Sequence, residues 1–306
     1  MHHDMDDCLI IGAGPAGLTA AIYLGRFLLR VRIVEDAQSR AALIPETHNH
    51  AGFPNGIAGS DLLGRMRQQA ELHGAMIEHG VVTHLRKRDS IFIASVGTRE
   101  IKARTLLLAT GVVNHRPRMD TAEHDEALSR GLLRYCPICD GYEVTDKRIA
   151  VLGTGERGVN EAVFLRSFTA DVTLIAPDGP HELSSSDRQR IAESGIALVD
   201  GPAEDFAIGR ADALTLEAAG SRLSFDSLYP ALGSAVRSEL AVQVGASTSE
   251  EGCLRVDSHQ QTTLPGLFAA GDVVLGLDQI SHAIGAAGVA AVTIRNLLAS
   301  STPLLR

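Results

Sequence analysis

Residues 8–17 read Cys8-Leu9-Ile10-Ile11-Gly12-Ala13-Gly14-Pro15-Ala16-Gly17. The apolar run predicts a buried strand, and a small-residue helical pattern from Leu18 to Leu29 follows the glycines. In such a strand, turn and helix unit, Gly12 makes the turn and Gly14 lets a pyrophosphate approach the backbone, while Gly17 packs the helix against the strand. The alternative interpretation is a glycine-rich turn that binds nothing.

The segment after this helix favours nucleotide binding. Residues 31–35 read as a second strand, which ends in the carboxylate of Glu35 at the spacing expected for an acceptor of ribose hydroxyls. Because strand, helix and acid agree, we predict a dinucleotide site. Pro15 and Ala16 lie within the turn, and Pro15, together with later segments, favours FAD over a nicotinamide here.

The endings of two later apolar strands assign them to the same predicted site. One runs from Thr105 and ends in Ala109-Thr110-Gly111, and the other runs from Pro265 and ends in Gly271-Asp272. Either strand alone is compatible with an ordinary core strand and turn. Since the second one arrives only after residue 260, the unit that begins the chain is predicted to be discontinuous.

A second copy of the pattern lies between these parts. Its strand, glycine turn, helix and next strand are expected at residues 147–152, 153–158, 159–168 and 171–176. The sequence therefore predicts an α/β fold with two dinucleotide-binding, Rossmann-like, three-layer domains, the second inserted in the first. The expected domains are residues 1–114 with 238–306 for FAD and residues 115–237 for an NAD(P)H-binding-like insert. Crossing linkers at 114–117 and 232–239 would allow a hinge.

A cysteine pair precedes the second glycine turn, in the stretch Cys136-Pro137-Ile138-Cys139-Asp140. Such a spacing holds two sulfurs close enough for a small disulfide ring and favours a reactive thiolate, so it predicts two-electron redox chemistry. Half of a zinc site is the alternative. The other cysteines, Cys8 and Cys253, are isolated, so we expect no metal. His48 and His50 also lack a third ligand nearby, which favours a surface or flavin-side loop.

Length and composition agree with a two-domain globular protein. The chain has 306 residues, and its formal net charge of −9 disfavours a nucleic-acid or anionic-membrane partner. The longest weakly polar run, residues 283–294, is too short to span a bilayer, so no membrane segment is expected. The acidic N-terminus lacks the features of a signal peptide, which predicts a cytoplasmic protein in which a cysteine pair is more often catalytic than structural.

This layout resembles the low-molecular-weight thioredoxin reductases, in a divergent form. The resemblance covers essentially the whole chain, and the cysteine pair just before the insert's glycine turn is its most specific part. It implies an FAD-dependent dithiol/disulfide oxidoreductase, a homodimer, and a thioredoxin-like protein or a small dithiol or disulfide as partner. It also implies that Asp272 contacts the FAD ribityl chain and that Gln279 and Ile280 lie beside the isoalloxazine.

The resemblance implies a role for each residue of the cysteine motif. Cys139 would face the flavin, and Cys136 would exchange with the disulfide of the partner. Asp140 would move protons to and from the departing thiolate. A turn or helix-cap acceptor is the alternative for Asp140, since Asp140-Gly141 is also a turn signal.

One departure from the family concerns the electron donor. NADPH-dependent members carry an arginine cluster after the second strand of the insert, where this chain has Ala176-Pro177-Asp178-Gly179. A carboxylate there repels a 2′-phosphate, and Arg188 and Arg190 are weak substitutes. The sequence therefore disfavours NADPH and favours NADH over it. The leading expectation is loss of nicotinamide binding, with an electron-transfer protein as a possible donor.

Another departure leaves two further functions open. The Gly-Gly-Gln segment of such reductases is replaced by Arg40-Ala41-Ala42-Leu43. The pattern from Cys136 to Glu143 also resembles that of dithiol oxidases of epidithio natural-product pathways, which usually carry His at the place of Asp140. An oxygen-using dithiol oxidase and a flavin-binding redox sensor without turnover are therefore the alternatives.

Overall fold

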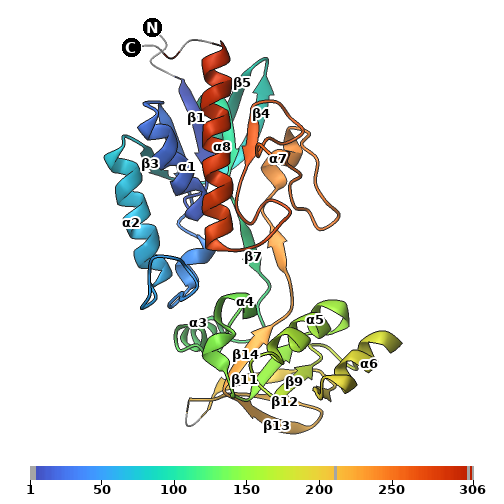
Figure 1. Ribbon diagram of the computed structural model, residues 1–306. Helices are drawn as coiled ribbons and strands as arrows, with labels where there is room; N and C mark the ends of the chain where they lie inside the picture. The colour runs from blue at the N-terminus through green and yellow to red at the C-terminus, as the bar shows by residue number, and fades with distance from the viewer. Residues whose placement is uncertain (1–4, 210–211, 302–303, 305–306) are drawn as a thin grey trace.

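The computed structural model describes residues 5–209, 212–301 and 304. Two lobes are joined by a thin pair of strands (Figure 1). We call the lobe that holds β1 (Asp6–Ile11) and α8 (Ile280–Ser301) the first lobe, and the other one the inserted lobe. The far ends of the expected domain ranges, residues 1–4 and 305–306, lie outside the described residues.

A seven-stranded sheet organises the first lobe, in the order β3-β2-β1-β6-β5-β4 with β16 beside β6. The strands are β1 (Asp6–Ile11), β2 (Val31–Glu35), β3 (Met76–His79), β4 (Val82–Arg88), β5 (Ile91–Val96), β6 (Arg99–Leu108) and β16 (Leu267–Ala269). The hairpin β4–β5 pairs antiparallel with the first half of β6, and β16 pairs parallel with its second half. This last pairing brings the Gly271-Asp272 segment to the same sheet edge as the first glycine turn.

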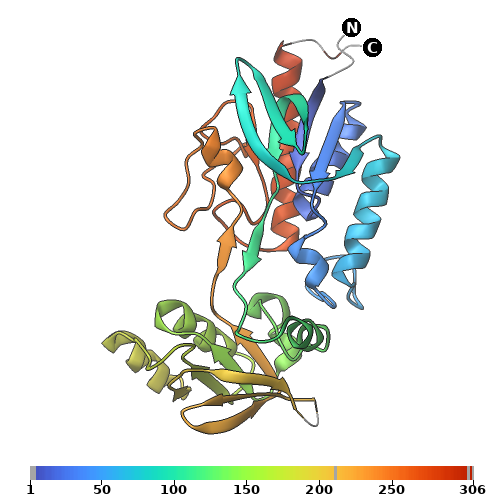
Figure 2. The same ribbon diagram turned by 180° about the vertical axis from the view of Figure 1, so that it is seen from behind.

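Helices cover one face of this sheet, as both ribbon views show (Figure 2). These helices are α1 (Pro15–Arg26), α2 (Gly59–Leu72), α8 (Ile280–Ser301) and the short η1 (Arg40–Leu43). The short helix α7 (Glu239–Gln243) lies on the other face. Leu18, Leu24 and Ile294 are among the buried side chains of the helical face, and Phe92 lies in the core of the other face. The helix α1 begins three residues before the expected pattern because Pro15 occupies its first turn, where proline fits best.

The expectation that no segment could span a membrane is wrong by length and composition. The helix α8 is 22 residues long and apolar enough to cross a bilayer, because it continues past the glycine-interrupted run to Ser301. It nevertheless packs along α1, and Ala287, Ala290 and Ala291 on it are buried in the core of the first lobe. Small side chains on both helices allow this close approach. We therefore read α8 as a core helix.

The inserted lobe has a four-stranded parallel sheet in the order β10-β9-β8-β14. Its strands are β8 (Ile149–Leu152), β9 (Val172–Ile175), β10 (Ala197–Val199) and β14 (Ser227–Pro230). The helical segments are α3 (Thr121–Ser129), α4 (Pro137–Asp140), η2 (Tyr142–Val144), α5 (Gly155–Leu165) and α6 (Ser185–Glu193). A three-stranded antiparallel sheet of β11 (Glu204–Ile208), β12 (Leu214–Ala218) and β13 (Ser221–Phe225), which the sequence did not indicate, packs on this lobe.

The connection between the lobes is a paired ribbon. Strand β7 (Val112–Asn114) pairs antiparallel with β15 (Ser234–Val236), close to where separate crossing linkers were expected. The two crossings are therefore hydrogen-bonded to each other. The α/β architecture, with one mixed and one parallel sheet of the dinucleotide-binding type, agrees with the predicted fold class. The helix α4 with the cysteine pair lies on the side of the inserted lobe that faces the first lobe (Figure 1).

Candidate active site

A cavity of about 780 Å³ runs from the first glycine turn to the cysteine pair. It is lined by most of the residues predicted for the cofactor, namely Gly12, Gly14, Pro15, Ala16, Glu35, Ala109, Thr110, Gly111, Gly271, Asp272, Gln279 and Ile280. The inserted lobe contributes Cys136, Cys139 and Asp140. Gly17 lies behind the turn and does not line the cavity. The fold thus brings sequence segments more than 250 residues apart around one elongated space.

Two glycines shape the phosphate end of the cavity. Gly12 has a φ of +104°, and a Cβ there would lie 2.3 Å from the carbonyl oxygen of Ala109. A Cβ on Gly17 would lie 1.9 Å from the carbonyl oxygen of Gly12. The helix α1 follows without a side-chain cap at Gly14, so its first N–H groups are free to donate to an anion.

We expect Gly17→Ala to lose FAD and to be less stable. The methyl group must push α1 away from the turn, and overpacking of this kind typically costs about 1–3 kcal/mol. Flavin content after purification and the thermal unfolding midpoint measure both effects. Gly64→Ala on α2 is the matched control, because a Cβ there meets nothing within 4 Å. A Gly17→Ala protein with normal flavin content and wild-type stability would contradict this role.

Glu35 is held in place at the end of β2. Its Oε2 accepts from the backbone N–H of Ala37 at 2.6 Å, and its Oε1 accepts from Nη2 of Arg67 at 2.6 Å. Both partners fix the carboxylate, and each oxygen keeps a further lone pair for a ribose hydroxyl. The glycine cradle, the uncapped helix and this acid fit an extended dinucleotide such as FAD.

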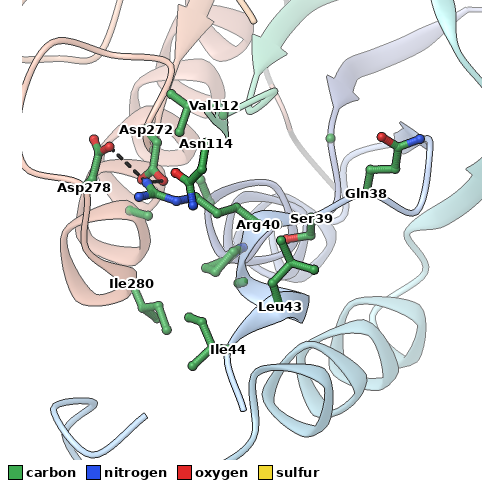
Figure 3. Close-up of a pocket in the computed structure, with 18 of the residues that line it drawn as sticks. Gln38, Ser39, Arg40, Leu43, Ile44, Val112, Asn114, Asp272, Asp278 and Ile280 are labelled. Atoms are coloured by element: carbon green, nitrogen blue, oxygen red, sulfur yellow. Dashed lines mark hydrogen bonds and ion pairs between the residues drawn. The ribbon is translucent and has the colours of Figure 1, made fainter. Parts of the chain in front are cut away.

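The sequence did not predict a charged group that lies across the cavity. Nη1 of Arg40 lies 3.0 Å from Oδ2 of Asp272 and 3.0 Å from Oδ2 of Asp278 (Figure 3). Burial and the neighbouring Asp272 raise the pKa of Asp278, and Arg40 opposes that shift. Arg40 stands in the segment that replaces the Gly-Gly-Gln of the family. This replacement was the only feature of the sequence that marked the position as unusual. Arg40 holds Asp272, the predicted ribityl contact, in a fixed position.

Cys136 and Cys139 form a disulfide at the start of α4. Pro137 occupies the first turn of this short helix, and Sγ of Cys136 caps it by accepting from the backbone N–H of Cys139 at 3.2 Å. Nε2 of Gln279 lies 3.3 Å from Sγ of Cys136 and 3.2 Å from Sγ of Cys139. Nδ2 of Asn49 in turn donates to Oε1 of Gln279 at 3.0 Å. The structure thus places predicted cofactor and catalytic residues in direct contact.

Asp140 follows Cys139 in the chain, and its carboxyl lies between two side chains. Its Oδ1 accepts from the hydroxyl of Tyr229 at 2.8 Å, and its Oδ2 lies 3.1 Å from Nη1 of Arg134. Burial raises the pKa of the Asp140 carboxyl, while Arg134 and Tyr229 oppose the shift. A carboxyl with a raised pKa near a sulfur is suited to proton transfer. The sequence analysis gave no role to Tyr229 or Arg134.

A second acid, Glu161 on α5, lies near α4, the helix that carries the cysteine pair. Burial raises the pKa of Glu161 on α5 to about 7, and among the described residues its Oε1 has no hydrogen-bond partner. A more open cavity of about 470 Å³ separates this helix from α4, with Ile138 and Arg157 among its lining residues. Asp140 contributes to the raised pKa of Glu161, so the two acids influence each other.

The loop after β9 carries the expected carboxylate, paired with a cation that the sequence did not indicate. Oδ1 of Asp178 lies 2.6 Å from Nη2 of Arg118, and both side chains are exposed. Arg188 donates to the carbonyl of His181, and Arg190 is paired with Asp187. The two arginines considered as substitutes are therefore engaged within the loop and helix that follow β9.

The loop that carries His48 and His50 contacts both lobes. Nε2 of His48 lies 3.4 Å from Glu46, and its Nδ1 lies 3.8 Å from Glu143 of the inserted lobe. The ring of His50 stacks on Phe53. Within residues 5–209, 212–301 and 304, no group of three or more histidine, cysteine or acidic side chains is arranged to hold a metal ion.

Comparisons with known proteins agree with this site. The family model described as pyridine nucleotide-disulphide oxidoreductase matches residues 6–287. A thioredoxin reductase of Mycolicibacterium smegmatis is 32% identical over 280 residues, covering 88% of both chains. The crystal structure of thioredoxin reductase from Streptococcus pyogenes has a TM-score of 0.86 at 27% identity, over 97% of this chain and 99% of that one. The structure of HlmI has a TM-score of 0.88 at 26% identity, over 98% and 94%.

The fold and the site together define a flavin-dependent disulfide oxidoreductase. Two dinucleotide-type lobes, a cavity that fits FAD and a disulfide at the end of that cavity are its defining parts. The chain belongs to the pyridine nucleotide-disulphide oxidoreductase family, on its thioredoxin reductase branch. Family membership implies FAD and a pyridine nucleotide as cofactors.

Proposed function

We propose that this protein passes electrons through the Cys136–Cys139 pair to a thioredoxin-like protein. The observation that carries the proposal is the position of the disulfide, which lies at the end of the cofactor cavity and within hydrogen-bond distance of Gln279. When FAD is bound, it supplies or accepts the electron pair. The names of the curated relatives, which are thioredoxin reductases, support the same partner class.

The residues around the pair provide for the protons. Reduction breaks the S–S bond with two electrons, and each sulfur that becomes a thiol takes one proton. We propose that Asp140 delivers and accepts the proton of one sulfur, since burial keeps its carboxyl protonated to higher pH than usual. Tyr229 and Arg134 hold the carboxyl in place from the inserted lobe. Exchange with the partner then re-forms the disulfide and leaves two thiols on the partner.

An anaerobic titration tests this function. Enzyme reduced with dithionite is mixed with oxidised thioredoxin, and the expected result is one dithiol formed on thioredoxin for each electron pair delivered. In a parallel aerobic assay, the enzyme receives small dithiols and oxygen without thioredoxin. Stoichiometric hydrogen peroxide from added small dithiols, with no transfer to thioredoxin, would instead establish the oxygen-using dithiol oxidase. No flux in either assay would leave a redox sensor.

We expect NADPH to be a poor reductant, with NADH the better of the two. A 2′-phosphate would meet the carboxylate of Asp178, which is paired with Arg118. Among the described residues, Arg188 and Arg190 are engaged elsewhere and offer no free pair of arginines. Loss of a bidentate phosphate contact costs about 1.5–3 kcal/mol, which is tenfold or more in affinity. Stopped-flow mixing with each nucleotide measures flavin bleaching. Bleaching within seconds at micromolar NADPH would contradict the prediction, and no bleaching with either nucleotide would point to an electron-transfer protein.

We also propose a homodimer in the cytoplasm. Exposed apolar side chains occur on α1 and α8, which pack side by side on the outer face of the first lobe. Tyr23 stands on α1 and Phe27 directly follows it, and Val289 and Val292 stand on α8. An apolar face of this kind supports association through the first lobe, which leaves the inserted lobe free for a partner protein.

A further inference from the structure

A chain of side-chain hydrogen bonds leads from the first lobe to the disulfide. Oγ1 of Thr47 donates to Oδ1 of Asn49 at 3.0 Å, and Nδ2 of Asn49 donates to Oε1 of Gln279 at 3.0 Å. Nε2 of Gln279 then faces both sulfurs of the pair. Because the amide oxygen of Gln279 already accepts from Asn49, its amide N–H groups are the end that faces the disulfide.

We propose that Gln279 is a catalytic residue that stabilises the thiolate of the reduced cysteine pair, and that Asn49 is the residue that positions it. The proposal rests on the proposed function, in which the pair accepts electrons. On accepting two electrons and one proton, the S–S bond breaks and leaves one thiol and one thiolate. A disulfide sulfur is a weak hydrogen-bond acceptor, whereas a thiolate carries a charge and accepts strongly. The contact with Gln279 therefore strengthens on reduction and favours the reduced form.

The anchoring of Asn49 supports this role. Its Nδ2 also lies 3.5 Å from the backbone carbonyl of Ile138, so it contacts the cysteine helix as well as Gln279. Thr47 is buried, and its backbone exchanges hydrogen bonds with Ile57. The first lobe thus holds the orienting group rigidly against the inserted lobe. Figure 3 shows Ile280, the residue after Gln279, among the side chains of the cavity.

The test measures the pair itself in the FAD-loaded enzyme, without a nicotinamide or a partner protein. After reduction with dithiothreitol and its removal, the alkylation rate by iodoacetamide gives the thiolate fraction at pH 7. Glutathione buffers give the ratio of reduced to oxidised pair. We expect Gln279→Leu to lower the thiolate fraction about tenfold and the reduced ratio about tenfold, which is about 30 mV for a two-electron couple. The control Gln189→Leu, on the exposed face of α6, should match the wild type.

Substitution of Asn49 tests the orientation of the amide. Asn49→Ala leaves the side-chain amide of Gln279 free to turn, so we expect a smaller loss of thiolate fraction and of reduced ratio than in Gln279→Leu. In Asn49→Asp the new carboxylate can only accept, so it should draw Nε2 of Gln279 away from the sulfurs and produce the larger loss. A Gln279→Leu enzyme within twofold of the wild type in both measurements would overturn the proposal. Equal effects of the two Asn49 variants would overturn the positioning role. Thioredoxin turnover of the wild type, measured separately, decides the proposed function independently.

Discussion

Cys139→Ser is expected to reduce turnover with oxidised thioredoxin by at least about 10³-fold while the protein keeps its FAD. Loss of one sulfur makes the Cys136–Cys139 disulfide impossible, and removal of a nucleophile from a unit of this kind typically abolishes the whole reaction. The phosphate end of the cavity, at Gly12 and the start of α1, is unchanged, so flavin content should stay near that of the wild type. Steady-state thioredoxin reduction and flavin absorbance measure the two quantities.

Cys253 provides the matched control for this substitution. It is a free, half-buried cysteine of the first lobe and does not line the cavity. Cys253→Ser should therefore turn over within about twofold of the wild type, since surface-type substitutions away from a site have small effects. If Cys139→Ser retained a tenth of wild-type turnover, electrons would have to reach thioredoxin by another path.

Asp140→Asn is expected to slow disulfide exchange by about 10²-fold or more, because the amide has no acidic proton to give. The sign of the pH effect follows from the raised pKa of Asp140. Only the protonated carboxyl donates, so the wild-type rate should fall as the pH rises through that raised pKa. The Asn variant lacks this group and should lack the corresponding limb of the pH profile. Rates of exchange between pH 5 and 9 provide the measurement.

Asp146→Asn, at an exposed position with positive φ that asparagine tolerates, serves as the control. It should retain both the wild-type rate and the wild-type pH profile. If the exchange rate of Asp140→Asn kept the pH dependence of the wild type, another group would be the proton donor. Glu161, whose pKa burial raises to about 7, would be the next acid to replace.

The parts of the fold that follow a repeated local pattern could be predicted from the sequence. Both strand, turn and helix units are present, because Gly12 and the buried strand before it are constrained by short-range geometry. Their helices begin earlier than expected, at Pro15 and at Gly155 within the expected turn. The apolar length of α8 was underestimated because its glycines interrupt the hydrophobic run without ending the helix. The antiparallel sheet β11–β12–β13 was missed because its pairing depends on contacts between segments with no distinctive turn motif.

The site was predictable where a motif carries the chemistry and unpredictable where only folding brings side chains together. The cysteine pair and Asp140 stand in one short stretch, so their proximity could be inferred. Tyr229 reaches Asp140 from a strand 89 residues away, and Arg40 reaches Asp272 across 232 residues. No spacing in the sequence indicates such contacts. Asn49 and Gln279, both of the first lobe, likewise meet across 230 residues, and the packing of the two lobes brings the disulfide to them.

A single-turnover experiment tests the central claim, that electrons pass through the Cys136–Cys139 pair to a thioredoxin-like protein. Anaerobic enzyme receives one electron pair beyond flavin reduction, is mixed with oxidised thioredoxin, and is quenched with an alkylating agent at successive times for mass spectrometry. We predict that Cys136 and Cys139 are alkylated before mixing, and that they are protected again as a disulfide at the rate at which thioredoxin thiols appear. A reduced flavin beside a disulfide that stays closed, or opened cysteines that never transfer to thioredoxin, would contradict the account.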